Sequence, residues 1–241
     1  MRVRPTDGLD RLVAAGLSVF GAKGFQRAQM ADVAQAMGVA PGTLYGYIES
    51  KEALLHLVLD RALPVSGEAP PPAPPPLPCP TPAPGATLDL LHARLDMEAA
   101  LPRLRRAARS KPTAAALEEL REVVRELYRL LARARGAILV IERSALEMPD
   151  LARLFYHAKR RRLLARLEAY LASRMRAGRL RTLSPPGVAA RILLENVAMF
   201  AMHRHRDPDP EPIDDATVEA AVLDFVVGAF TPSPKPKRGR G

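Results

Sequence analysis

The side chains best suited to chemistry in this chain are hydrogen-bond donors gathered between Gly38 and Lys51, where the sequence reads Gly-Val-Ala-Pro-Gly-Thr-Leu-Tyr-Gly-Tyr-Ile-Glu-Ser-Lys. The pattern predicts a tight turn, a helix of about seven residues and the start of another helix. Such a short helix, with Thr43, Tyr45 and Tyr47 around one apolar residue, has little core of its own. Neighbouring helices must hold it, as they hold the reading helix of a helix-turn-helix.

Amphipathic segments on both sides supply those neighbours. Apolar residues from Leu9 to Phe20 recur at helical spacing and predict a first helix that ends before Gly24. A second helix over about residues 30–37 stops at Gly38, where a residue without Cβ suits a sharp turn. Pro41 opens the third helix, and Ser50 caps a fourth that carries an apolar run.

These features resemble the DNA-binding domain of the TetR family of bacterial transcriptional regulators. The matching residues, in the family's order and spacing, are Gly24-Phe25, Asp32-Val33-Ala34, Gly38-Val39, Gly42-Thr43-Leu44-Tyr45, Tyr47 and Ser50-Lys51-Glu52. The resemblance is motif-specific from about Arg4 to Leu63 and architectural beyond. It implies an all-α fold in which a three-helix helix-turn-helix domain joins a larger helical bundle for ligand binding and dimerisation.

The resemblance also implies roles for individual side chains. The hydroxyls of Thr43 and Tyr47 and the ammonium of Lys51 would contact DNA phosphates, and Tyr45 would contact a base edge or a thymine methyl. Core packing is the structural alternative for Tyr47. The predicted DNA-binding set is Arg27, Gln29, Pro41, Gly42, Thr43, Tyr45, Gly46, Tyr47 and Lys51.

Several positions depart from the family pattern. Ala28 and Ala40 stand where the family usually has capping Thr and Ser residues, and Pro41 and Gly46 occupy positions that often carry Lys and a polar residue. Each change removes a hydrogen-bonding group, for which Gln26, Arg27 and Gln29, or an N-terminal arm with Arg2 and Arg4, would compensate. We therefore expect ordinary regulator affinity with modest base discrimination.

Composition favours a two-part protein. The 241 residues, 48% of them hydrophobic, can form a small domain and a larger one. The predicted boundaries are 1–63 for the helix-turn-helix domain, 64–85 for a proline-rich linker, 86–230 for the regulatory and dimerisation domain, and 231–241 for a basic disordered tail. In the linker, eleven of the twenty-one residues from Pro64 to Pro84 are proline, so it should be extended or disordered. Surface loop and flexible tether both remain open, as does a ligand for a proline-binding partner.

The net charge of +10 does not come from the motif region. Residues 1–63 contain seven basic and six acidic side chains, a balance of +1. Much of the excess lies between Arg94 and Arg181 and in the tail, where solvated helix faces or non-specific attraction of phosphates explain it.

The second half predicts helices throughout. They cover a segment from Leu88 that breaks near Pro102, a longer helix capped by Thr113, a short one over Ala137–Leu146, a long one from Pro149 to Gly178, one over about 188–203, and a last one capped by Asp214. In the family the last two helices form the dimer interface. Their wide apolar faces and small residues fit this role, although an intramolecular core would look similar.

An effector site is the least determined feature. The family binds a small molecule in the larger domain, and the candidate lining residues are Tyr128, Phe155, Tyr156, Asn196, Met199 and Phe200. Each of them alone also fits ordinary core or surface. His203 and His205 do not share a helix face, and the one cysteine, Cys79, forms neither a disulfide nor a thiolate cluster, so we expect no metal and no cofactor.

The sequence contains no Gly-rich phosphate loop, Gly-x-Ser-x-Gly or His-Glu-x-x-His motif, so we expect no enzyme. Without an apolar run of about eighteen residues, a cytoplasmic protein with no membrane partner is expected. The leading interpretation is a ligand-responsive, sequence-specific regulator, a repressor that acts as a homodimer on palindromic double-stranded DNA. The alternative is a helical ligand-binding or interaction scaffold with weak, mostly non-specific DNA binding.

Overall fold

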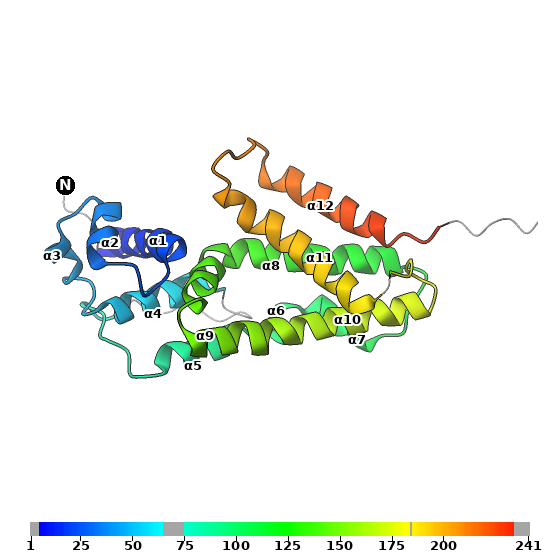
Figure 1. Ribbon diagram of the computed structural model, residues 1–241, viewed down its shortest axis with the longest axis horizontal. Helices are drawn as coiled ribbons and strands as arrows, with labels where there is room; N and C mark the ends of the chain where they lie inside the picture. The colour runs from blue at the N-terminus through cyan, green and yellow to red at the C-terminus, as the bar shows by residue number, and fades with distance from the viewer. Residues whose placement is uncertain (1–4, 65–74, 184, 234–241) are drawn as a thin grey trace, which may run out of the picture. The chain divides into compact units, whose positions relative to one another are not determined.

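A computed structural model describes residues 5–64, 75–183 and 185–233 of the chain. The elements of this described part are helices, which confirms the all-α prediction (Figure 1). The described residues form two compact units: an N-terminal unit within residues 5–64, 75–100 and 133–160, and a C-terminal unit within residues 101–132, 161–183 and 185–233. The domain boundaries at 63, 85 and 230 stay a prediction.

The first four helices occur where the sequence places them: α1 (Pro5–Lys23), α2 (Met30–Met37), α3 (Pro41–Leu44) and α4 (Lys51–Ala62). Gly24 and Gly38 take the positive φ values, 81° and 68°, that end α1 and α2. The four residues of α3 are fewer than the seven expected. Beyond Leu44 the chain continues in turns, with the Gly46 N–H donating to the Thr43 carbonyl and the Tyr47 N–H to the Leu44 carbonyl.

Apolar side chains from all four helices form the core that holds α3. Leu12, Phe20, Val33, Leu44 and Leu54 are fully buried or nearly so. The crossing of α1 and α4 is close, because a Cβ built on Gly16 would lie 2.6 Å from a Val58 methyl carbon. Burial of this surface, worth about 25 cal/mol per Å², stabilises α3, a helix that is too short to be stable alone.

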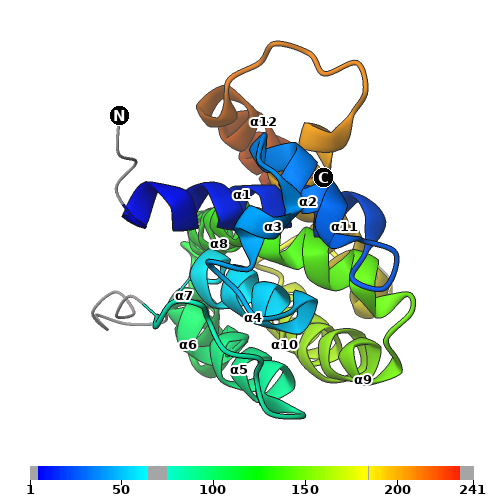
Figure 2. The same ribbon diagram turned by 90° about the vertical axis from the view of Figure 1, so that its left-hand side faces the viewer.

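The proline-rich segment contains no helix over residues 75–84, bends at Leu77 and Pro78, and leads back to the start of α4. The next helix, α5 (Ala86–Arg94), then runs beside α4 in the same direction (Figures 1 and 2). Thr87 Oγ1 lies 3.1 Å from His56 Nδ1 at one end, and Arg94 pairs with Asp60 one turn farther along α4. Because α5 is parallel to α4, the chain must first return along the length of α4, which is about 18 Å for its twelve residues.

The predicted division between the helix capped by Thr113 and the short helix over Ala137–Leu146, which falls at Gly136, was wrong. One helix, α8 (Ala116–Ala145), continues through this glycine and replaces the two helices expected there. Within the N-terminal unit a Cβ on Gly136 would lie 3.2 Å from the side chain of Leu17, so the glycine permits a close helix contact instead of ending a helix. Short helices α6 (Met97–Ala100) and α7 (Pro102–Arg109) precede α8, so the segment from Leu88 breaks at Leu95, earlier than expected.

The remaining helices follow the sequence signals. Pro149 begins α9 (Pro149–Ala152), which continues through a π-helical stretch (Arg153–Arg160) into α10 (Arg161–Arg176), and Gly178 follows with a φ of 64°. α11 (Pro186–Ala201) is followed by a 3₁₀ turn (His203–Arg206). Asp214 caps α12 (Asp215–Ala229) by accepting from the Ala216 and Thr217 amides. In the C-terminal unit, α10 packs against α7 and α11, and α11 packs against α12.

Candidate nucleic-acid interface

The turn from Gly38 to Ser50 separates an inner from an outer face. Leu44 and Ile48 are fully buried and anchor the turn in the core of α1, α2 and α4. The outer face consists of the exposed residues Pro41, Gly42, Thr43, Tyr45 and Gly46. Five residues of the predicted DNA-binding set therefore lie together on one surface, and the buried Leu44 and Ile48 hold that surface against the helical core.

The two tyrosines of the turn have different surroundings. Tyr45 is 54% exposed, so its ring and hydroxyl face solvent. Tyr47 is half-buried against α1: a Cβ built on Gly8 would lie 2.5 Å from its hydroxyl oxygen. Tyr47 thus combines ring packing with a hydroxyl at the edge of the helix-turn-helix, and Gly8 is the residue that leaves room for it.

The Lys51 ammonium forms hydrogen bonds with backbone carbonyls of the protein itself, and these bonds were not predicted from the sequence. Its Nζ donates to the carbonyls of Phe25, Gln26 and Ala28 at 3.0, 3.3 and 3.1 Å and lies 4.6 Å from the centre of the Phe25 ring. The three N–H donors of the ammonium are therefore engaged with the α1–α2 loop. A phosphate contact of Lys51 stays a prediction, and it would have to share these donors.

Gln29, one of the residues proposed to compensate for Ala28, is the N-cap residue of α2, and Asp32 completes a capping box with it. The Asp32 carboxylate accepts from the Gln29 backbone N–H at 2.9 Å and pairs with Lys23 at 2.7 Å. The Lys23 ammonium and this amide hold the pKa of Asp32 below its usual value. Arg27, predicted to face DNA, pairs with Glu147 at 2.5 Å.

The last turn of α8 fixes the same α1–α2 loop from a second side within the N-terminal unit. The buried Ser144 hydroxyl accepts from the Phe25 N–H at 3.1 Å, and Arg143 Nε donates to the Ala22 carbonyl at 3.2 Å. A Cβ on Gly24 would lie 3.2 Å from the Arg143 carbonyl, so glycine is favoured there by both φ and space. Contacts from α4 and α8 together define the position of this loop.

The predicted effector residues are distributed over both units. Phe155 and Tyr156 form an edge-on ring pair, centroids 5.0 Å apart, in the N-terminal unit. In the C-terminal unit Tyr128 is buried, and burial raises the pKa of its phenol, whereas Met199 and Phe200 are exposed. Neither unit by itself brings the six together, and their role as ligand contacts stays a prediction.

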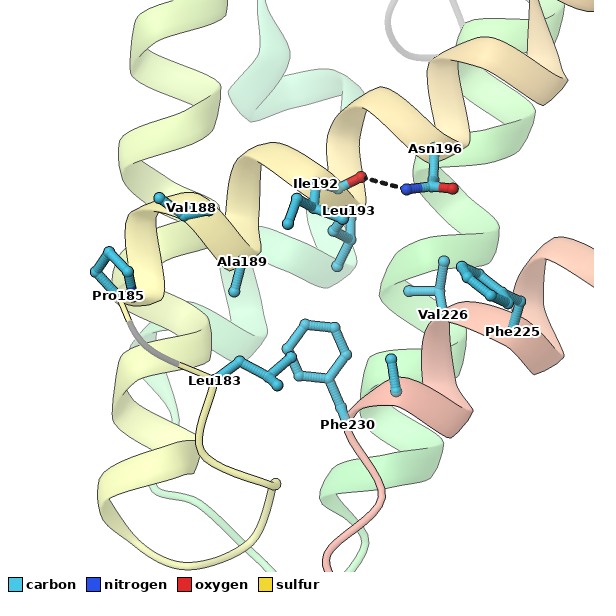
Figure 3. A pocket seen from close by; sticks show the side chains of 11 residues that line it. Leu183, Pro185, Val188, Ala189, Ile192, Leu193, Asn196, Phe225, Val226 and Phe230 are labelled. Atoms are coloured by element: carbon cyan, nitrogen blue, oxygen red, sulfur yellow. Dashed lines mark hydrogen bonds between the residues drawn. The ribbon is translucent and has the colours of Figure 1, made fainter.

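Asn196 is the one of these six that lines a hollow of ≈ 210 Å³ between α11 and α12. Figure 3 shows its amide bonded to the Ile192 carbonyl, at 2.9 Å, amid apolar side chains. Around the hollow the large apolar residues Val188, Ile192 and Phe225 are exposed, Phe225 by 68%. Large apolar side chains that are exposed next to one another are typical of a protein–protein contact surface.

Arg174 is a buried cation that sequence reasoning missed. It is completely buried in the C-terminal unit, where Nε lies 2.9 Å from Glu119 Oε1 and Nη2 donates to the Ala107 carbonyl at 2.6 Å. The Ser110 hydroxyl and the Tyr170 ring complete its surroundings. It is one of many arginines in this region, and only its packing distinguishes it.

Within 5–64, 75–183 and 185–233 no three His, Cys, Asp or Glu side chains are grouped so that they could hold a metal ion. No helix in those ranges is sufficiently long and apolar to cross a membrane.

Comparison with family models matches both halves of the chain. Residues 12–58 match the model of bacterial regulatory proteins of the tetR family, and residues 118–228 match the C-terminal domain of AefR-like transcriptional repressors. The first match spans the described helix-turn-helix core. No curated protein matched the sequence.

Solved structures share the fold at low identity. The ketosteroid transcriptional regulator KstR2 of Mycobacterium tuberculosis is 16% identical, with a TM-score of 0.57 over 96% of this chain and 98% of that one. A TetR-family member from Streptomyces coelicolor A3 is 21% identical, with a TM-score of 0.54 over 90% of each chain. AibR, in complex with isovaleryl coenzyme A and operator DNA, is 18% identical, with a TM-score of 0.50 over 90% of this chain and 96% of that one.

Proposed function

The chain belongs to the TetR family of bacterial transcriptional regulators, and from this premise we propose that it is a ligand-responsive repressor that binds a palindromic operator as a homodimer. The observation that carries the proposal is the exposed outer face of the turn, Pro41 to Gly46, on a buried anchor of Leu44 and Ile48. Small and hydroxylated residues there allow close approach of DNA and donate to its phosphates.

Phosphate docking is assigned to Thr43 and Tyr47, and base contact to Tyr45. The Tyr47 hydroxyl is held in place by ring packing on α1, so it offers a positioned donor with little side-chain entropy to lose. Glycine at 42 and 46 leaves few side chains that could read bases. We therefore expect strong dependence on phosphate contacts and modest discrimination between sequences.

Dimerisation through α11 and α12 would bring two reading turns onto one operator. Val188, Ile192 and Met199 lie along one face of α11, at intervals of four and seven residues, and Phe225 is exposed on α12. A second copy of the chain would cover these apolar side chains. Half-sites about 34 Å apart, or a multiple of that, would then match the two turns.

The effector is proposed to be a small molecule bound by the helices outside the helix-turn-helix. Isovaleryl coenzyme A is the ligand in the AibR complex, so acyl-coenzyme A thioesters are the first class to test. A ligand that favours a dimer with a different spacing of its reading turns would release the operator by a population shift.

A titration onto DNA tests the proposal directly. Fluorescence anisotropy at physiological salt should show saturable binding to a fragment from upstream of the protein's own gene, well above its binding to random DNA. Tyr47→Ala should lose on the order of tenfold or more in affinity, and Tyr47→Phe, which keeps the ring packing, should lose less. Equal affinity for both DNAs would support the scaffold alternative instead.

The dimer is tested by a charge placed on the exposed apolar face. Phe225→Glu should give a monomer by light scattering and weaken operator binding on the order of 100-fold, because two linked half-sites become independent. Leu146→Glu, at an exposed leucine of the N-terminal unit outside α11 and α12, is the matched control. A Phe225→Glu variant that remains dimeric would exclude this interface.

A further inference from the structure

The proline-rich segment contacts the reading turn itself. Residues 77–84, here called the strap, include Cys79, whose N–H donates to the Tyr47 carbonyl at 2.7 Å and whose carbonyl accepts from the Glu49 N–H at 3.0 Å. Ile48 and Cys79 thereby form a parallel β-bridge. Both backbone hydrogen-bonding groups of Cys79 are thus used to hold the residues that join α3 to α4.

Side chains extend this contact to the start of α4. The Thr81 N–H donates to Glu49 Oε2 at 2.9 Å, and its hydroxyl donates to Ser50 Oγ at 2.8 Å. Ser50 Oγ in turn accepts from the Ala53 N–H and caps α4. Cys79 is only 5% exposed, so the strap is packed against the turn as well as bonded to it.

Prolines restrict the backbone of the strap on both sides of Thr81, and few residues separate it from α5. Pro80, Pro82 and Pro84 fix φ at alternate positions, and α5 begins at Ala86. Proline-rich chain acts as a semi-rigid spacer of about 3.1 Å per residue, so displacement of one end is passed to the other with little slack. At its far end α5 is fastened to α4 through the His56–Thr87 and Asp60–Arg94 contacts.

We propose that the strap is a positioning element for DNA binding, which holds the turn from Tyr47 to Ser50 in the geometry that docks on DNA and links that geometry to the placement of α5. The inference rests on the proposed function, because it concerns the same DNA-reading turn. The strap is therefore a stiff connection within the N-terminal unit that transmits movement between the turn and α5. It does not behave as the flexible tether that was one of the alternatives for this segment.

A pair of substitutions at one position separates the backbone bond from the side chain. Cys79→Pro removes the N–H that binds the Tyr47 carbonyl, whereas Cys79→Ala keeps it. Loss of one buried hydrogen bond corresponds to about a threefold to tenfold drop in operator affinity for Cys79→Pro. Cys79→Ala should bind DNA as the wild type does, and circular dichroism verifies that both variants are folded.

The single cysteine of the chain also reports on the strap directly. Burial raises the pKa of the Cys79 thiol, so labelling by a thiol reagent should be slow while the strap is docked. Thr81→Val, which removes the hydroxyl bonded to Ser50, should accelerate labelling and weaken operator binding together. By reciprocity, operator DNA should slow the labelling of wild-type protein and random DNA should slow it less.

The outcomes distinguish the strap from the regulator proposal. If wild-type protein shows no preference for operator DNA, the proposed function fails, whatever the strap does. If wild-type protein binds the operator and Cys79→Pro binds it equally well, the strap has no positioning role and the regulator stands. Faster labelling of Thr81→Val with unchanged operator affinity would also overturn the strap's role. Pro80→Gly with Pro82→Gly should weaken binding more than the control Pro75→Gly with Pro76→Gly, upstream of the strap.

Discussion

Each unit contains a cation whose N–H groups bind backbone carbonyls near the end of a helix, and the two differ in charge compensation. In the C-terminal unit Arg174 binds the Ala107 carbonyl in the last turn of α7 and forms a two-point pair with Glu119. In the N-terminal unit Lys51 binds three carbonyls of the α1–α2 loop. No ion pair of Lys51 occurs within the described part of the chain.

This difference suggests which cation is available to function. Arg174 is fully buried and its charge is neutralised by Glu119, so it is not available to a ligand in solution. Lys51 is half-buried beside the reading turn, and carbonyl groups satisfy its donors without cancelling its charge. The same ammonium can therefore hold the loop and contribute a positive field for phosphates.

The largest effect is expected at Arg174. Arg174→Met leaves Glu119 without its partner and should lower the free energy of unfolding by about 3–5 kcal/mol, as measured by urea denaturation. The operator affinity of the folded fraction should stay unchanged, because the contacts of Arg174 include neither the reading turn nor the exposed face of α11 and α12. Glu119→Gln, which keeps a hydrogen-bond acceptor, should be milder; equal stability of Arg174→Met and wild type would contradict a structural role.

Lys51 should show effects on both stability and DNA binding. Lys51→Met removes three charge-assisted hydrogen bonds and should lower the free energy of unfolding by about 1–3 kcal/mol. If the ammonium also neutralises a phosphate, the slope of log affinity against log salt should fall by about 1 for each subunit.

Lys51→Arg is the control that separates these roles. The planar guanidinium keeps the charge but cannot direct its donors to three convergent carbonyls as an ammonium does. We expect the salt slope to be retained and part of the stability to be lost. A Lys51→Met variant with an unchanged slope would make Lys51 a loop-holding residue alone.

The smallest effect is a pH dependence at the cap of α2. Because the pKa of Asp32 is lowered in the folded state, its contribution is fully present above the unfolded-state value of about 3.9 and is lost as pH falls through the folded-state pKa. Asp32→Asn should therefore be less stable than wild type at pH 7, and this difference should shrink as pH falls and vanish once Asp32 is protonated in both the folded and the unfolded state. Lys23→Met should reproduce part of the change; a stability difference independent of pH would contradict it.

Local signals in the sequence placed the helix ends. Gly24, Gly38 and Gly178 have the positive φ that glycine tolerates, Pro41 stands at a first helical position, and Ser50 and Asp214 cap their helices. Gly136 shows where local reasoning fails. A glycine inside a helix looks the same in sequence whether it ends the helix or permits a close contact, and only the approach of Leu17 decides between them.

The sequence by itself determined the all-α class, the helix-turn-helix and the outer face of the reading turn, because caps, turns and apolar periodicity are local in the chain. Only the tertiary structure decided what holds that turn. Lys51, Ser144 and Cys79 form hydrogen bonds with residues about 25 to 120 positions away in the sequence. Pairs so far apart produce no periodic pattern from which they could be predicted. The proline content predicted a non-helical segment. That this segment returns along α4, so that α5 lies parallel to α4, follows only from the contacts of Thr87 with His56 and of Arg94 with Asp60.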